Sequence, residues 1–310
     1  MRCHAFLPTY WDDYGAITMH SAIEEAALAA AALGYDGVWA NDEVIRPATE
    51  TVGAQVIEPL VTLASLVHLV PRLTLGTAVL VLPQRNAILV AKQVAALDLL
   101  SGHRLILGVG IGHRAEEFTL LGADFDHRAA MTDEAIEVLQ TLWREPVATY
   151  HGRFHQFDEV SMPPHPPDGG PPIWIGGNSP AAIKRAAKYG SGWLAFVHDQ
   201  DPFAHDLDDF RVGVALLREL TQGRPCPTIA NMLYLRIVKP DEPAVVRSTT
   251  PLMPPPLTGS PDAIAEHLNA YRQAGLEDAI LLFESEDLGD LLRQMRLFAE
   301  EVAPQFADAG

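Results

Sequence analysis

Short apolar runs alternate along the chain with longer stretches in which apolar residues recur every three or four positions. The pattern is clearest in Leu73–Glu117. Leu73–Leu82 is apolar and β-branched enough to be a strand buried on both faces. Ile88–Leu100 has helical spacing, Leu105–Val109 is a second apolar strand, and a helix begins near Ala115–Glu117. This order predicts two parallel strands lying side by side.

The same alternation extends over the rest of the chain. Further strands are predicted at Cys3–Leu7, Gly37–Ala40, Ile173–Ile175, Gly192–Val197, Thr228–Val238 and Ala279–Phe283. Further helices are predicted at Ala22–Leu33, Glu58–Val70, Met131–Trp143, Phe210–Leu220, Ala263–Ala274 and Leu291–Val302, with another starting at Pro180. Eight strands, each followed by a helix, predict an α/β fold, a (β/α)8 TIM barrel in which residues 1–310 form a single domain.

Two proline-rich stretches interrupt the pattern, at residues 145–172 and 239–258. Because strands and helices resume directly after each of them, we interpret both as irregular insertions of the barrel, after its fourth and seventh strands. The second stretch is long enough to be a lid, and its composition is equally compatible with disorder.

Charge and composition exclude several classes of function. The net charge is −18, with 40 acidic and 22 basic residues, whereas nucleic acid and anionic membranes require a basic surface. No apolar run approaches the roughly 20 residues that span a bilayer. The N-terminus has no basic region followed by an apolar signal core, so we expect a cytoplasmic protein. Cys3 and Cys226 are far apart and are expected to be reduced.

Candidate chemistry lies at the carboxyl ends of the predicted strands, where parallel α/β folds bind ligands. Gly108, Gly110 and Gly112 leave a surface without side chains, suited either to a flat ligand or merely to close packing. A dinucleotide fingerprint would place its third glycine at position 113, which is histidine, so the spacing does not favour that motif.

The segment Gly176-Gly177-Asn178-Ser179-Pro180 has the pattern of a helix start. Its free amides, with Lys184 and Arg185 nearby, form an arrangement that binds phosphate. A well-capped surface helix with solvated cations is the alternative.

Two further groups of polar residues are candidate sites. Asp42 and Glu43 end the second strand and form either a solvated turn or part of a site. His151, His155 and His165 lie in the first insertion without a carboxylate or cysteine at supporting spacing, so no metal site is expected there.

Five segments carry a family resemblance: GYDGVWAND (34–42), LTLGTAVLVLPQRN (73–86), LSGHRLILGVGIG (100–112), PPIWIGGNSPAAIKRAAKYGSGWL (171–194) and LTGSPDAIAEHLNAYRQAGL (257–276). The chain resembles the luciferase-like monooxygenase superfamily, particularly its oxidoreductases that use the deazaflavin coenzyme F420. The resemblance implies hydride transfer to or from a small organic substrate, in an enzyme that we expect to be a homodimer. The alternatives are an FMN-dependent monooxygenase that uses O2, and a catalytically silent barrel that binds flavin.

The resemblance also assigns roles to residues. It implies a cis peptide bond between Ala78 and Val79, pressed against the cofactor ring. Many relatives carry Asp-His where this chain has Asp42 and Glu43, so Glu43 and His113 are expected to share proton transfer, with Asp42 holding the loop or touching the cofactor. The alternative is that Glu43 is a solvated loop acid and His113 an ordinary cap. The expected cofactor-binding residues are Asp42, Ala78, Val79, Gly110 and Gly112 around the ring, and Gly176, Gly177, Asn178 and Ser179 at the phosphate.

Overall fold

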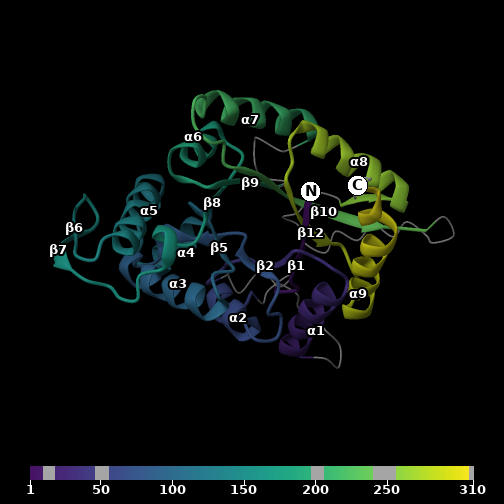
Figure 1. Cartoon of the computed structure of the whole chain (residues 1–310), viewed down its shortest axis with the longest axis horizontal. Coiled ribbons are helices and arrows are strands. Elements are labelled where there is room, and N and C mark those ends of the chain that lie inside the picture. Colours follow the sequence, from purple (N-terminus) through teal and green to yellow (C-terminus); the bar gives the residue numbers. More distant parts are fainter. Residues whose placement is uncertain (10–17, 46–55, 197–205, 240–255, 307–310) are drawn as a thin grey trace.

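The computed structural model describes residues 1–9, 18–45, 56–196, 206–239 and 256–306. Within them, parallel strands close into a barrel (Figure 1). Its eight strands are, in order around the barrel, β1 (Arg2–Phe6), β2 (Gly37–Ala40), β3 (Thr74–Thr77), β5 (Leu105–Gly110), β8 (Ile173–Gly176), β9 (Gly192–Phe196), β10 (Thr228–Ile237) and β12 (Asp278–Phe283). β12 pairs with β1 and closes the ring, which confirms the predicted (β/α)8 barrel.

Helices surround the strands (Figure 1). They are α1 (Met19–Ala32), α2 (Pro59–Leu66), α3 (Ala87–Ser101), α4 (Ala115–Leu121), α5 (Arg128–Arg144), α6 (Pro180–Tyr189), α7 (Leu207–Leu220), α8 (Pro261–Ala274) and α9 (Leu288–Leu297). Their ends follow local chemistry: the side chains of Asn86 and Ser179 cap α3 and α6, and Gly102 ends α3 at a φ of 68°. In the part of the chain that the structure describes, no helix has the length and apolarity to cross a membrane.

Each barrel strand alternates between two apolar cores, because successive side chains point to opposite faces. One set packs against the helices, for example Leu107 and Leu281. The other fills the barrel interior with Phe6, Trp39, Trp174, Leu194, Ala230, Tyr234, Ile280 and Leu282. At the amino ends of the strands, Asp278 binds His4 (2.8 Å) and Arg2 (2.7 Å). The opposite end of the barrel, where the strands finish, is therefore the mouth.

The predicted strand Leu73–Leu82 is divided in the structure. β3 ends at Thr77, the peptide bond between Ala78 and Val79 is cis as the resemblance implied, and β4 (Leu80–Val81) then pairs with β5. Gly76 lies opposite Ile106, whereas Leu80 lies opposite Val109, so the register slips by one residue between the two segments. The sequence does not reveal this division, because an apolar run looks the same with or without such an irregularity.

The two insertions are partly regular. Residues 145–172 contain an antiparallel hairpin of β6 (Ala148–His151) and β7 (Gln156–Val160). The carboxylate of Glu134 fixes its turn by accepting hydrogen bonds from the amides of Arg153 (2.8 Å) and Phe154 (2.7 Å). In the second insertion, β11 (Leu257–Gly259) adds to β10. Residues 240–255, which hold most of the predicted lid or disordered segment, lie outside the described residues.

Candidate active site at the barrel mouth

The side chain of Val79 contacts glycines of two other strands at the mouth. A Cβ atom added to Gly110 of β5 would lie 2.5 Å from Cγ2 of Val79, and one added to Gly176 of β8 would lie 2.6 Å from Cγ1. The two glycines therefore make room for the Val79 side chain, so the bare surface predicted from the sequence is covered by an apolar one. Ala78 and Val79 are only partly buried and line the barrel interior. The structure thus places Ala78, Val79, Gly110 and Gly176 side by side.

Gly112 has a different role from Gly110. It adopts a φ of +75°, which favours glycine. A Cβ at this position would meet the ring of Phe118 at 2.8 Å and the side chain of Val81 at 2.6 Å. Gly112 thus lets the chain turn from β5 toward α4 while Phe118 packs closely against it.

Asp42 anchors the loop that follows β2. Its side chain is 1% exposed and forms a two-pronged ion pair with Arg85, at 2.6 and 2.7 Å, while also accepting from the amide of Val81 at 2.8 Å. Burial raises the pKa of Asp42, and the Arg85 guanidinium opposes that rise. Of the two roles expected for Asp42, these contacts support holding the loop.

Glu117 holds the same loop from the other side and was not singled out by the sequence. This buried residue of α4 accepts from the amides of Val44 (2.5 Å) and Ile45 (3.1 Å), and from Nε2 of Gln84 (2.7 Å). Nothing in the sequence distinguishes Glu117 from the exposed Glu116 beside it, because only the fold decides which one is buried.

Glu43 and His113 lie on adjacent loops, after β2 and β5. Glu43 forms an ion pair with Arg114, at 3.4 Å between Oε1 and Nε, and its side chain is 12% exposed. His113 is exposed and directly precedes Arg114. The ion pair therefore joins the two loops that carry the predicted proton-transfer residues, and leaves their shared role a prediction.

The turn between β8 and α6 has the predicted helix start. Gly177 adopts a φ of +126° and its amide donates to the carbonyl of Leu194 (3.1 Å). The buried side chain of Asn178 bonds both main-chain groups of Phe196, at 2.6 and 3.1 Å, and Ser179 caps the helix. The amides of Asn178 and Ser179 make no hydrogen bond within the described residues, so both are free to donate.

The cations expected near this turn are placed differently. Arg185 is buried and binds Asp133 of α5, so it serves the packing of α6 on α5 and is not directed to a phosphate. Lys184 is exposed on the same helix. The sequence alone could not separate the two because adjacent helical residues face different directions only once the buried side is known.

Glu284, the first residue after β12, is an acid that sequence reasoning missed. It has the same strand parity as the interior residues Ile280 and Leu282 and is 5% exposed. Burial, and secondly the negative charge of Asp290, raise its pKa to about 7. The rule that selected Asp42 and Glu43, polar residues at a strand's carboxyl end, would also have selected Glu284 after the predicted strand Ala279–Phe283.

Two of the three histidines in the first insertion pair with acids. His151 contacts Asp158 at 2.9 Å and His155 contacts Glu134 at 3.1 Å. Across the described part of the chain, no three histidine, cysteine, aspartate or glutamate side chains are grouped so that they could hold a metal ion.

The sequence of this chain is similar to those of known proteins. An uncharacterised protein of Mycobacterium tuberculosis is 35% identical over 183 residues, which cover 59% of this chain and 61% of that protein. An F420-dependent hydroxymycolic acid dehydrogenase of the same species is 28% identical over 229 residues, covering 72% of this chain and 60% of that one. The matches thus span about three fifths of these relatives' length.

Solved structures agree in fold. The crystal structure of a monooxygenase from Streptomyces bottropensis superposes with a TM-score of 0.84 at 21% identity, over 99% of this chain and 100% of that one. The profile of the family described as luciferase-like monooxygenase matches residues 1–250. The chain belongs to the luciferase-like monooxygenase family.

Proposed function

We propose that this protein is a coenzyme F420-dependent oxidoreductase that transfers hydride to or from a small organic substrate. The observation that carries the proposal is the arrangement at the mouth, where Val79 covers Gly110 and Gly176 beside the turn that starts α6. The F420-dependent relative supports the deazaflavin over other cofactors.

The residues present fit such a cofactor. A flat, largely apolar ring suits the wall formed by Ala78 and Val79, which is partly exposed toward the mouth. A phosphate suits the amides of Asn178 and Ser179 at the start of α6, because an anion is favoured at a helix N-terminus. When bound, the deazaflavin supplies the hydride chemistry, and the protein supplies position and exclusion of water.

The chain's own residues then divide the remaining tasks. Val79 supports the ring and needs glycine at positions 110 and 176, while Gly112 shapes the loop after β5. Gly177 makes the turn that presents the next two amides. Asp42 keeps the β2 loop in place, and Glu43 and His113 exchange a proton with the substrate at the mouth.

An FMN-dependent monooxygenase is the second candidate, favoured by the fold shared with the Streptomyces bottropensis enzyme. Turnover separates it from the first candidate and from a silent flavin-binding barrel. Reduced F420 and reduced FMN are each mixed with the protein, with and without O2 and with and without a panel of small ketones and aldehydes as hydride acceptors, and their oxidation is followed by absorbance beside controls without protein. We expect oxidation to depend on an organic hydride acceptor and not on O2. O2-dependent oxidation of reduced FMN that is coupled to an oxygenated organic product, and is absent from a control without protein, would favour the monooxygenase. No protein-dependent oxidation of either cofactor would favour the silent barrel.

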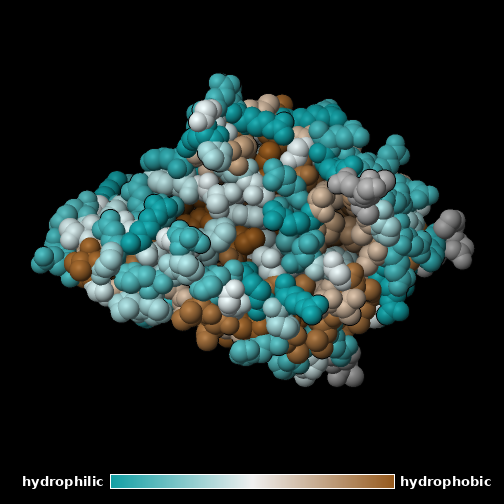
Figure 2. Space-filling view, viewed as in Figure 1, coloured by the Kyte–Doolittle hydropathy of each residue, from teal (hydrophilic) through white to brown (hydrophobic). Residues whose placement is uncertain are grey.

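We further propose that the protein is a homodimer. Exposed apolar residues gather on α2 and α3, seen along the lower edge of the molecule in Figure 2. They are Val61, Ile88, Leu89, Leu99 and Leu100, which we call the α2–α3 face. An apolar surface of this kind favours contact with another protein, and a second copy of the chain presents the same face.

A further inference from the structure

The last barrel strand ends in an acid that none of the roles above uses. The amide of Glu284 donates to the carbonyl of Leu235 at 2.8 Å, so the residue continues the pairing of β12 with β10. Ile280 and Leu282 point into the barrel, and alternate residues of a strand face the same side. The Glu284 side chain therefore enters the barrel from its mouth, the end at which such folds bind ligands.

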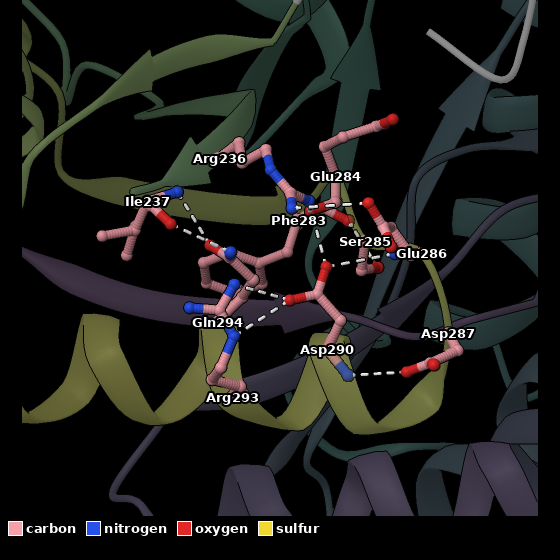
Figure 3. A network of polar contacts seen from close by, with 10 residues as sticks. All are labelled: Arg236, Ile237, Phe283, Glu284, Ser285, Glu286, Asp287, Asp290, Arg293 and Gln294. Carbon is pink, nitrogen blue, oxygen red and sulfur yellow. Dashed lines mark hydrogen bonds and ion pairs between the residues drawn. The ribbon is translucent and has the colours of Figure 1, made fainter. Parts of the chain in front are cut away.

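The carboxyl group of Glu284 has no partner in the described part of the chain, although the residue is 5% exposed. The nearest guanidinium, that of Arg236, donates from Nη1 to the main-chain carbonyl of Glu284 (3.2 Å) and to Asp290 (3.0 Å). Figure 3 shows the Glu284 side chain pointing away from this pair and from α9. The residue is largely buried and the tip of its side chain is open to the mouth, so an unpaired carboxyl stands where a ligand in the mouth can reach it.

The charges around Glu284 are largely neutralised by one another. Asp290 of α9 is bound by Arg236 and by Arg293 (2.7 Å), and Glu286 lies 4.0 Å from Arg236. On the other side of β12, β1 brings the uncharged Phe6 into the interior. With its pKa raised to about 7, Glu284 is present both as the acid and as the carboxylate near neutral pH. It can therefore donate a proton or accept one.

The surroundings also restrict what Glu284 can bind. The barrel interior below it is apolar and aromatic, with Trp39, Tyr234 and Leu282 among its side chains. An anionic group would be repelled by Glu284 whenever that side chain is a carboxylate. An ammonium group would require a charged Glu284 in a place where burial favours the neutral acid. An uncharged molecule with a hydroxyl or carbonyl group fits both constraints.

We propose that Glu284 is a substrate-binding carboxyl of the barrel mouth, which holds the hydroxyl or carbonyl oxygen of an uncharged, largely apolar substrate. As the neutral acid it donates a hydrogen bond to a carbonyl oxygen, and as the carboxylate it accepts one from a hydroxyl. The inference rests on the proposed function only in that the substrate occupies the mouth.

Infrared spectroscopy tests the proposal with three probes of one shape: cyclohexanone, cyclohexanol and methylcyclohexane. The full chain is measured alone and with F420, and a response in either state counts. The C=O stretch of a protonated carboxyl is followed from pH 5 to pH 9 in the parent and in Glu284→Gln. Glu286→Gln is the matched control, since that neighbouring side chain is 53% exposed. Probe affinity is measured by ligand-observed NMR in Glu284→Leu, with circular dichroism as a check of folding.

We expect a carboxyl band that disappears as the pH rises through about 7, is lost in Glu284→Gln and is kept in Glu286→Gln. Cyclohexanone should shift this band and methylcyclohexane should not. Glu284→Leu should weaken cyclohexanone and cyclohexanol about tenfold, the effect of one buried hydrogen bond, and leave methylcyclohexane unchanged or tighter. The proposal would be overturned if cyclohexanone does not shift the carboxyl band with or without F420. It would also be overturned if a folded Glu284→Leu protein binds cyclohexanone and cyclohexanol within about twofold of the parent's affinity. The result without F420 stands even if the cofactor assignment fails.

Discussion

At the scale of single residues, the mouth is organised by acids whose surroundings the sequence does not reveal. Asp42, Glu117 and Glu284 are all buried side chains, yet they differ in their partners: a guanidinium for Asp42, two main-chain amides and Gln84 for Glu117, and no described group for Glu284. A buried carboxylate is stabilised by donors aimed at it and is neutralised without them. These three residues should therefore respond differently to substitution.

Replacing Asp42 by asparagine should destabilise the protein. The change removes a negative charge that pairs with Arg85 through two hydrogen bonds. The Arg85 side chain, which is only 16% exposed, then loses its buried partner. The expected loss in free energy of unfolding is about 2–3 kcal/mol, measured by urea denaturation. Asp158→Asn is the control, because Asp158 is 69% exposed in a pair with His151 and should change stability by less than about 0.5 kcal/mol. Equal effects in the two variants would show that Asp42 does not anchor the loop.

Glu284 should make the stability of the protein depend on pH. Its folded-state pKa of about 7 lies above the ordinary glutamate pKa of 4.5, so the folded state binds the proton more tightly than the unfolded state. This group's contribution to stability is then present at low pH and is lost as the pH rises through about 7. The urea midpoint of Glu284→Gln minus that of the parent should therefore be larger at pH 8 than at pH 5. A difference between the two proteins that is the same at both pH values would contradict the raised pKa.

At the scale of elements, most strands and helices could be predicted because their apolar periodicity is strong and their caps are local. The side chains of Asn86 and Ser179 begin α3 and α6, and Gly102 ends α3. What could not be predicted depends on neighbours distant in sequence. The break between β3 and β4 is an example, as is the side chain of Val79 lying over two glycines of other strands.

The contact between Val79 and Gly110 can be tested by paired substitutions. Gly110→Ala should destabilise the barrel by about 1–3 kcal/mol, because the new Cβ would lie 2.5 Å from Cγ2 of Val79. In a Val79→Ala background Cγ2 is absent, so Gly110→Ala should lower the free energy of unfolding by at least about 1 kcal/mol less than it does in the parent. Urea denaturation of the parent, both single variants and the double variant gives the coupling. Additive effects would mean that Val79 does not pack on Gly110.

At the scale of the whole molecule, the closed barrel follows from counting eight strand–helix units, whereas the assembly of chains does not. The candidate site was only partly accessible from sequence: the segments at the strand ends were found, but Glu117 and Glu284 depend on burial that appears only in the closed barrel. The α2–α3 face likewise emerges only when α2 and α3 lie side by side on one surface.

The dimer proposal predicts a change in mass. Leu89 and Leu100 are 58% and 62% exposed on the α2–α3 face, and replacing both by glutamate should convert a dimer to a monomer in sedimentation velocity. Val212→Glu, on α7, is the control, since Val212 is 70% exposed away from that face and the variant should remain dimeric. A monomeric parent, or a double variant that stays dimeric, would exclude this interface.

The choice of cofactor is the central claim, and a direct titration tests it. The protein is titrated with F420 and, separately, with FMN, and binding is followed by the fluorescence of each cofactor. We predict saturable binding of one F420 per chain, at least about tenfold tighter than FMN, which corresponds to about 1.4 kcal/mol. Tighter binding of FMN, or no binding of F420, would contradict the assignment.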